Sequence, residues 1–227
     1  MKNSVSPSID LNYLQELFFS REKLVSHLVT RLERHETKEY IYKDTESVDA
    51  AVLIPVYFKD GEAHLLFTKR TENLEHHKGQ ISFPGGRKDD TDKDLLETAL
   101  RETDEELGIR KDDISVLGQT DIFLTNTHFL VTPYVGIFDY PYSFTVNKAE
   151  IDRLIHVPLS YLVRDDIFEV KDYKKSGYTW HLHYYHAGND VIWGVTGFLL
   201  SNFLSIAFGF QRNHFGAPIL DLPSGGK

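Results

Sequence analysis

The chain has 227 residues, of which 41% are hydrophobic and 13% aromatic, and its formal net charge at pH 7 is −9. This length and apolar content are enough for one substantial hydrophobic core. The acidic balance argues against a general nucleic-acid-binding surface, which needs a basic face. With no cysteine, the chain excludes disulfides, thiolate catalysis and cysteine-ligated zinc, and it fits any redox compartment.

The N-terminal part of the chain predicts helix. Residues 1–19 lack the uninterrupted apolar stretch of a secretory signal, and the ending LPSGGK is not a peroxisomal S-K-L address, so the expected location is cytoplasmic. A helical apolar period between Leu11 and Glu36 indicates one or two helices. We therefore expect residues 1–45 to form a helical extension, as a lid, a dimer arm or a packing cover, and residues 46–227 to form the main domain.

The middle of the chain predicts mostly strands. Residues 51–58 read as an apolar strand, Asp60-Gly61 as a hairpin turn and residues 64–70 as the returning strand. Further strands are expected over residues 114–124 and 131–138, and a late hairpin over 168–170 and 179–186. Strands outnumber helices, and the order of the elements fits an α/β (α+β) protein.

Residues 191–210 contain no formal charge and reach the length of a membrane span. Small residues recur in it every four positions, the pattern of close helix packing in lipid: Gly197, Ser201, Ser205 and Gly209. However, polar residues dilute the hydrophobicity, and residues 191–193 fit a strand. We expect a core or dimer-contact helix here, with a membrane role as the less favoured alternative.

The segment richest in chemistry is residues 83–109, FPGGRKDDTDKDLLETALRETDEELGI. On a helix, Glu102, Glu105 and Glu106 fall within an arc of about 100°. Three clustered carboxylates repel one another unless a cation neutralises them, and hard oxygen ligands suit Mg²⁺ or Mn²⁺. A separate, mostly apolar stripe is expected to be buried: Leu96, Ala99, Leu100, Thr103 and Leu107.

The alternative is that this charge run is only the solvated face of a helix. Three features argue against that alternative: the FPGG turn upstream, Arg101 directly before the first glutamate, and Gly108 as a helix stop.

These residues resemble the Nudix box, whose pattern is G-x5-E-x7-R-E-U-x-E-E-x-G-U with U aliphatic. Arg101-Glu102, Glu105-Glu106 and Gly108-Ile109 match its last three elements. The departures from the pattern are few: Gly86 lies one residue further from Arg101, Lys93 occupies the slot of the first Glu, and Thr103 replaces the aliphatic residue. The contribution of that first Glu must come from Asp92, Asp94 or Glu97, or be absent.

Residues 66–86, LFTKRTENLEHHKGQISFPGG, are similar to the signature L-L-T-x-R-[SA]-x3-R-x3-G-x3-F-P-G-G of Nudix hydrolases that act on coenzyme A. Thr68, Arg70, Gly79 and the run 83–86 fit with the same spacing, and the likeness extends over residues 48–210. Glu75 stands where the signature has Arg, which keeps other anionic substrates open.

The resemblance implies an α/β/α sandwich around a mixed sheet, with the N-terminal helical extension added to it. It also implies divalent-metal-dependent hydrolysis of the diphosphate linkage in coenzyme A or its derivatives, giving adenosine 3′,5′-bisphosphate and 4′-phosphopantetheine. The expected partner is a small CoA-like nucleotide, and no nucleic-acid or membrane partner is expected. Homodimerisation is left as an open alternative. The alternatives are Nudix hydrolysis of ADP-ribose, NADH or a dinucleotide, and a non-catalytic nucleotide sensor.

Within this interpretation the acidic helix supplies the metal ligands. Glu102 and Glu106, one helical turn apart, are the first choices for Mg²⁺ or Mn²⁺, with Glu105 flanking and a carbonyl of Gly85 or Gly86 completing the shell. Arg101 is expected to orient a carboxylate by a charge-assisted hydrogen bond.

Residues outside the helix complete the expected site. Glu150, shortly before a VPL run, is a candidate for a further ligand or the general base, and a solvated loop residue is an equal alternative. Arg70, Lys78 and Arg87 are expected to meet substrate phosphates. His181 and His183 alternate along a predicted strand, so zinc is conceivable, although ordinary strand-surface histidines are favoured.

Overall fold

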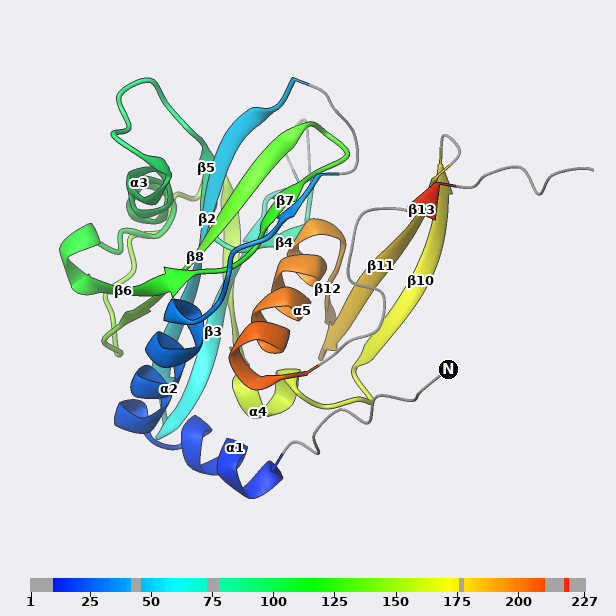
Figure 1. Cartoon of the computed structure of the whole chain (residues 1–227). Helices are drawn as coiled ribbons and strands as arrows, with labels where there is room; N and C mark the ends of the chain where they lie inside the picture. The colour runs from blue at the N-terminus through cyan, green and yellow to red at the C-terminus, as the bar shows by residue number, and fades with distance from the viewer. Residues whose placement is uncertain (1–9, 42–45, 73–77, 176–177, 211–218, 221–227) are drawn as a thin grey trace, which may run out of the picture.

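The computed structural model describes residues 10–41, 46–72, 78–175, 178–210 and 219–220 (Figure 1). Its centre is a hairpin of β2 (Val48–Lys59) and β3 (Glu62–Arg70). The connecting Asp60 and Gly61 have φ of 52° and 81°, the positive values that tight hairpin turns require. The predicted hairpin is therefore confirmed.

The hairpin belongs to a nine-stranded mixed sheet with the order β1-β7-β8-β2-β3-β4, in which β5 pairs with β2, β6 with β8 and β9 with β3. β2 runs parallel to β8, and β1 parallel to β7, while the other pairs are antiparallel. The remaining strands are β1 (Glu39–Tyr40), β4 (Ile81–Ser82), β5 (Gly85–Arg87), β6 (Ile114–Gln119), β7 (Ile122–Leu124), β8 (Phe129–Phe138) and β9 (Ile151–Pro158).

This sheet differs from the sequence predictions in three places. The single strand expected over residues 114–124 is two strands, β6 and β7. Between them the Asp121 carboxylate accepts hydrogen bonds from Lys38 N (2.8 Å) and Asn202 Nδ2 (2.8 Å), which fixes a turn instead of a continuing ladder. The glycines of the expected FPGG turn belong to β5 and pair with β2. β9, which carries the VPL run, was not expected as a strand.

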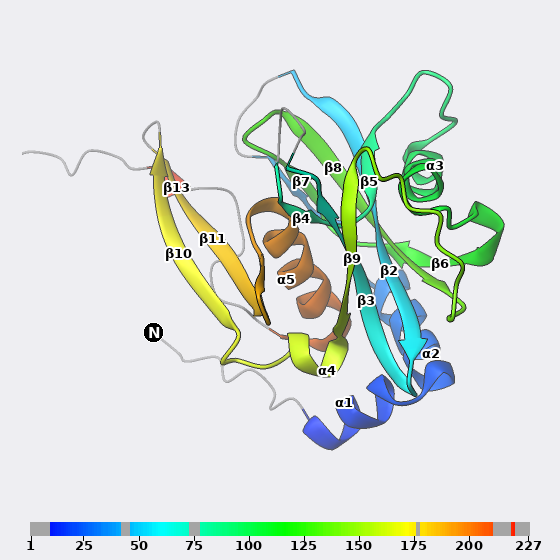
Figure 2. The same cartoon turned by 180° about the vertical axis from the view of Figure 1, so that it is seen from behind.

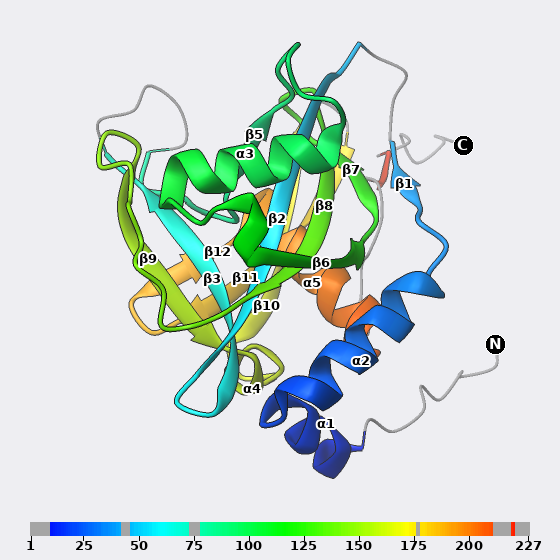
Figure 3. The same cartoon turned by 90° about the vertical axis from the view of Figure 1, so that its left-hand side faces the viewer.

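Helices cover both faces of the sheet. α3 (Leu95–Leu107) packs on β2 and β5 on one face, and α5 (Gly194–Phe208) lies on the other (Figures 1 and 3). This arrangement confirms the α/β/α sandwich. The N-terminal region forms two helices, α1 (Leu11–Phe18) and α2 (Arg21–Glu33), and α2 contacts β6 and α5. A short α4 (Leu159–Leu162) and a 3-10 turn (Lys111–Asp113) complete the described helical segments.

A second, smaller sheet lies beyond α5. It contains β10 (Phe168–Lys175), β11 (Tyr178–Ala187), β12 (Asp190–Ile192) and β13 (Ile219–Leu220). From behind, α5 is sandwiched between this sheet and the central one (Figure 2). The late hairpin predicted from the sequence is β10–β11.

Most of α5 is buried, and its small residues pack inside the chain. A Cβ on Gly197 would lie 2.3 Å from the His183 carbonyl oxygen on β11. Ser201 Oγ forms hydrogen bonds with His183 Nδ1 (2.7 Å) and with the Tyr185 hydroxyl (2.6 Å). The expected core helix is therefore confirmed, and none of the described helices is long and apolar enough to cross a membrane.

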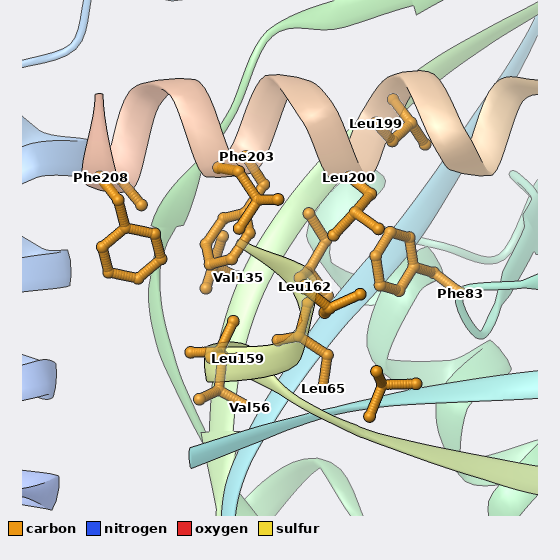
Figure 4. Close-up of a cluster of buried hydrophobic side chains, with 14 of the residues drawn as sticks. Val56, Leu65, Phe83, Val135, Leu159, Leu162, Leu199, Leu200, Phe203 and Phe208 are labelled. Atoms are coloured by element: carbon orange, nitrogen blue, oxygen red, sulfur yellow. The ribbon is translucent and has the colours of Figure 1, made fainter. Parts of the chain in front are cut away.

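The main core lies between α5 and the central sheet. Leu200 and Phe203 of α5 point towards Val56, Leu65 and Val135 of β2, β3 and β8 (Figure 4). The same cluster includes buried residues of the N-terminal helices: Leu14, Leu17, Phe18, Leu24, Leu28 and Leu32. Two hydrogen bonds fasten α2 to the end of α5: His27 Nε2 donates to Ala207 O (2.7 Å) and Arg31 Nε to Ile206 O (2.9 Å).

Candidate active site

The acidic helix α3 has well-defined ends. Asp94 caps its N-terminus by accepting a hydrogen bond from Glu97 N (2.9 Å), which satisfies one of the amides without a helical partner. Gly108 ends the helix in the left-handed conformation (φ 70°) and donates its N–H to Asp104 O (2.7 Å). The two caps therefore fix where α3 begins and ends.

Arg101 lies at the centre of an ion-pair network. Its Nε and Nη2 donate to both oxygens of Asp92 (2.8 and 2.9 Å), a bidentate pair, and Nη1 donates to Glu102 (2.9 Å) and Glu105 (3.0 Å). Asp92 is buried and also accepts a hydrogen bond from Thr98 Oγ1 (2.9 Å). The guanidinium holds the pKa of the Asp92 carboxyl well below its usual range. Arg101 thus orients carboxylates, as the sequence predicted.

This network also identifies which acid faces Arg101 in place of the missing first glutamate of the box. Asp94 is used as the helix cap, and Glu97 Oε2 accepts a hydrogen bond from Lys93 N (2.8 Å). Of the three candidates from the sequence, Asp92 is therefore the one that contacts Arg101.

The neighbours of Gly85 and Gly86 leave no room for a side chain at either position. A Cβ on Gly86 would lie 2.5 Å from the Glu102 carboxyl carbon, and one on Gly85 would lie 2.3 Å from Ala51 O. Gly85 also has φ of 151°, which favours glycine. The Glu102 carboxylate consequently rests directly on the β5 backbone.

Glu106 is more enclosed than the sequence predicted. It is 4% exposed, beside Thr103 and Leu107 in the buried part of α3, so the expected separation of apolar and acidic faces is wrong at this position. Its Oε2 is buried and has no hydrogen-bond partner. The pKa of Glu106 is raised to about 8, mainly by burial and also by the charges of Glu102 and Glu150, while Arg70 and the Gly85 backbone lower it.

Arg70 at the end of β3 faces two of the candidate acids. Its Nη1 lies 4.0 Å from Glu106 Oε1, and its Nη2 lies 3.9 Å from Glu150 Oε2. Glu150 is half-exposed, at the loop before β9, and its charge raises the pKa of Glu102 as well as that of Glu106. The structure therefore places Glu150 beside the acidic helix, as the sequence allowed.

These carboxylates fit a divalent cation by their chemistry. In the described part of the chain no three acidic or histidine side chains already converge into a metal cluster. The buried, unpartnered Glu106 oxygen and the neighbouring Glu102 carboxylate are nevertheless hard donors that a cation would satisfy.

A cavity of about 810 Å³ opens beside these glycines. Arg70, Gly85, Gly86 and Arg87 line one part of it. Lys78, predicted to bind substrate, is exposed and does not line it. Glu75, where the coenzyme A signature has Arg, lies outside the described residues, as do His76 and His77.

The remainder of the cavity wall was missed by the sequence reasoning. It comes from the β7–β8 loop, the start of α5 and the β10–β11 hairpin, and it is rich in aromatic residues: Phe123, Phe129, Tyr173, Trp180, Tyr184, Trp193 and Phe198. The signal was present in the aromatic content of the late hairpin, but only the fold brings it to the acidic helix.

The histidines of β11 have local partners. His183 is fully buried against Ser201, so it is not the strand-surface histidine that was expected. His181 Nδ1 forms a hydrogen bond with Asp172 Oδ1 (2.7 Å).

Comparison with known proteins agrees with this geometry. Residues 47–181 match the NUDIX domain. A Nudix hydrolase named NudL from Yersinia enterocolitica is 32% identical over 178 residues, covering 78% of this chain and 90% of its own. The peroxisomal coenzyme A diphosphatase of Mus musculus is 30% identical over 163 residues, covering 72% of this chain and 69% of its own.

A solved structure, the NUDIX domain of NrtR from Shewanella oneidensis with ADP-ribose, has a TM-score of 0.43 and 16% identity, over 58% of this chain and 82% of that one. At this level the likeness carries no argument about substrate. The family assignment rests on the domain match and on the two relatives. The chain is a member of the Nudix hydrolases, a family of pyrophosphatases that generally use divalent metal ions, and it falls in their coenzyme A pyrophosphatase-like subfamily.

Proposed function

We propose that this protein hydrolyses the diphosphate linkage of coenzyme A or its derivatives, with Mg²⁺ or Mn²⁺, to adenosine 3′,5′-bisphosphate and 4′-phosphopantetheine. The observation that carries the proposal is the buried Glu106 carboxylate, whose Oε2 has no hydrogen-bond partner and which lies beside Arg70, a residue of the cavity wall. A buried acid in this state is suited to metal binding rather than to folding stability.

The metal would be held by Glu102 and Glu106, with Glu105 and a carbonyl of Gly85 or Gly86 as further candidates. When bound, a divalent ion supplies charge screening for the diphosphate and activation of water. Phosphoryl transfer needs little from protein groups beyond positioning and charge stabilisation. Arg101 fixes the carboxylate of Glu102, and its own position is fixed by Asp92.

Residues outside α3 complete the proposed site. Glu150 is the proposed general base or additional ligand, because it is half-exposed and its charge reaches both Glu102 and Glu106. Arg70 and Arg87 are the proposed phosphate contacts, since both line the cavity next to the glycines of β5. Lys78 remains a weaker candidate, as an exposed residue outside that lining.

Support for coenzyme A as substrate comes from sequence. Thr68, Arg70, Gly79 and residues 83–86 match the signature of coenzyme A-specific members, and the mouse relative is named a coenzyme A diphosphatase. Glu75 in place of the signature Arg favours a second candidate, hydrolysis of another nucleoside diphosphate derivative such as ADP-ribose or NADH.

The test is product formation from coenzyme A, acetyl-CoA, ADP-ribose and NADH with Mg²⁺ or Mn²⁺. Glu106→Gln is compared with wild type, and Asp104→Asn, an exposed acid on the same helix, is the matched control. We expect metal-dependent coenzyme A cleavage that falls at least about 100-fold in Glu106→Gln and is retained in Asp104→Asn.

The other outcomes are equally informative. Cleavage of ADP-ribose or NADH alone would keep the mechanism and reject coenzyme A. Binding of nucleotide and metal without turnover of any substrate would instead favour a sensor.

A further inference from the structure

The cavity has two chemically different parts. Among the described residues that line the cavity, Arg70 and Arg87 are the only Lys, Arg, Asp or Glu. Both lie beside the glycines of β5. Towards α5 and the β10–β11 hairpin the lining becomes mainly aromatic and aliphatic, with Trp180, Tyr184 and Trp193 prominent. In a protein of net charge −9, a cavity whose described lining contains no Asp or Glu suits a ligand that is anionic at one end and apolar at the other.

We propose that the aromatic part of this cavity is the subsite for the uncharged half of the substrate, the pantetheine arm and an acyl group carried on its sulfur. This inference rests on the proposed function. With the diphosphate beside Arg70 and Arg87, one half of the molecule must extend towards the hairpin. The described lining of this part contains no Lys or Arg, so a phosphate there would lose hydration without that compensation, whereas an acyl chain would gain from burial.

The aromatic residues are arranged as a wall rather than as an open stacking platform. Tyr184 and Trp193 are stacked on each other, with ring centroids 5.9 Å apart and planes within 5°. Lys171 Nζ also lies over the Tyr184 ring, 4.7 Å from its centroid. Trp193 and Lys171 therefore already contact the Tyr184 ring, which favours lateral packing of an alkyl chain there over insertion of a purine.

The nucleotide half is the competing occupant. Residues 194–196, the first turn of α5, also line the cavity, and Trp193 at the N-cap makes no side-chain capping hydrogen bond. Free amides at a helix N-terminus attract phosphate, so this occupant has to be an explicit outcome of the test.

The experiment uses the two tryptophans of the chain, Trp180 and Trp193, which both line the cavity. Intrinsic fluorescence is titrated in chelator with the two half-substrates, S-octanoyl-pantetheine and adenosine 3′,5′-bisphosphate. In parallel, kcat/KM is measured with Mg²⁺ for coenzyme A, acetyl-CoA and octanoyl-CoA. The variants are Trp193→Ala, Trp193→Phe and, as an exposed aromatic outside the cavity, Phe19→Ala.

We expect S-octanoyl-pantetheine to change the fluorescence saturably and adenosine 3′,5′-bisphosphate to have no such effect. Because a fully buried methylene is worth up to about fourfold in affinity, kcat/KM should rise at least about tenfold from acetyl- to octanoyl-CoA. Trp193→Ala should reduce that ratio to near unity, Trp193→Phe should restore most of it, and Phe19→Ala should leave it unchanged.

Each contrary result has a distinct meaning. If coenzyme A is cleaved but the chain-length ratio is flat, or if Trp193→Ala leaves the ratio intact, the subsite is overturned and the proposed function stands. A fluorescence change with adenosine 3′,5′-bisphosphate alone would assign the cavity to the nucleotide half. Failure to cleave any coenzyme A species would reject the proposed function, and absence of a response to S-octanoyl-pantetheine would then reject the subsite independently.

Discussion

At the scale of single residues, Glu106 combines a cost in stability with a proposed role in metal binding. Its carboxylate is buried without a partner for Oε2, and its pKa is raised to about 8. A raised pKa means that the folded protein binds a proton more tightly than the unfolded chain. Ionised Glu106 therefore opposes folding in the absence of a cation, and a bound cation would remove that opposition.

The pH dependence of stability follows from this shift. Below about pH 4.5 Glu106 is protonated in both states and contributes no difference. As pH rises towards 8 the unfolded glutamate ionises while the folded one stays protonated, so metal-free wild type loses stability relative to Glu106→Gln. In chelator, Glu106→Gln should be more stable by on the order of 1 to 3 kcal/mol at pH 8 and by nothing at pH 4.

Urea unfolding across this pH range measures the effect, and Glu105→Gln, an exposed neighbour held by the same Arg101, is the comparison. A stability difference that is the same at pH 4 and pH 8 would contradict the assignment of the effect to ionisation. If Glu106 is a metal ligand, excess Mg²⁺ or Mn²⁺ at pH 8 should make wild type more stable than Glu106→Gln.

The pKa of Asp92 is shifted in the opposite direction to that of Glu106. Its pKa is depressed by the bidentate pair with Arg101, so it stabilises the fold above its ordinary pKa of about 3.9, and that contribution is lost as pH falls. Asp92→Asn leaves a half-enclosed guanidinium without its main partner. We expect a loss of about 2 to 4 kcal/mol at pH 7, measured by urea unfolding, whereas Asp90→Asn on the exposed loop should change stability by less than about 0.5 kcal/mol.

At the scale of elements, the site depends on how closely β5 and α3 approach. The sequence predicted α3 and its acids because helical spacing is local information, and it predicted the β2–β3 hairpin from its turn. It did not predict β5, since a two-glycine segment has no strand propensity of its own and is ordered by pairing with β2. The Nudix resemblance placed Gly85 or Gly86 near Glu102, but the packing of the Glu102 carboxylate against a strand backbone was not predicted.

Gly86→Ala tests this contact. The new methyl group would lie 2.5 Å from the Glu102 carboxyl carbon, too close for the carboxylate to keep its place. We expect metal-dependent turnover to fall by at least about tenfold, with a higher metal concentration needed for half-maximal activity. Gly61→Ala, in the β2–β3 turn with nothing within 4 Å, should lose only about 1 kcal/mol through its φ of 81° and should keep the metal requirement of wild type.

At the scale of the whole molecule, long-range contacts join parts that the sequence treats separately. The partly exposed His35 and the buried Asp121 and Asn202 connect the end of α2, the β6–β7 turn and α5 through hydrogen bonds of 2.6 and 2.8 Å. The cavity likewise combines the β5 glycines with the late hairpin. Neither connection can be deduced from periodicity, because each joins residues more than 80 positions apart.

The division of the chain at residues 45 and 46 remains a prediction that unfolding can test. α2 shares one hydrophobic cluster with the central sheet and α5, so the N-terminal helices should unfold together with the rest of the molecule. Leu28, fully buried in α2, is the residue to change. Leu28→Ala should lower the free energy of unfolding by about 2 to 5 kcal/mol, and Ser26→Ala, exposed on the same helix, by less than about 0.5 kcal/mol.

The test depends on which spectroscopic signal reports the loss of stability in Leu28→Ala. Trp180 and Trp193 lie in the late hairpin and at the start of α5, away from α2, so their fluorescence reports the opposite end of the chain, while far-UV circular dichroism reports all helices. In a single cooperative unit both signals shift by the same amount in Leu28→Ala. An early circular dichroism transition with an unchanged tryptophan transition would instead mean that the extension is an independent arm, and residues 46–227 would then hold the active site without it.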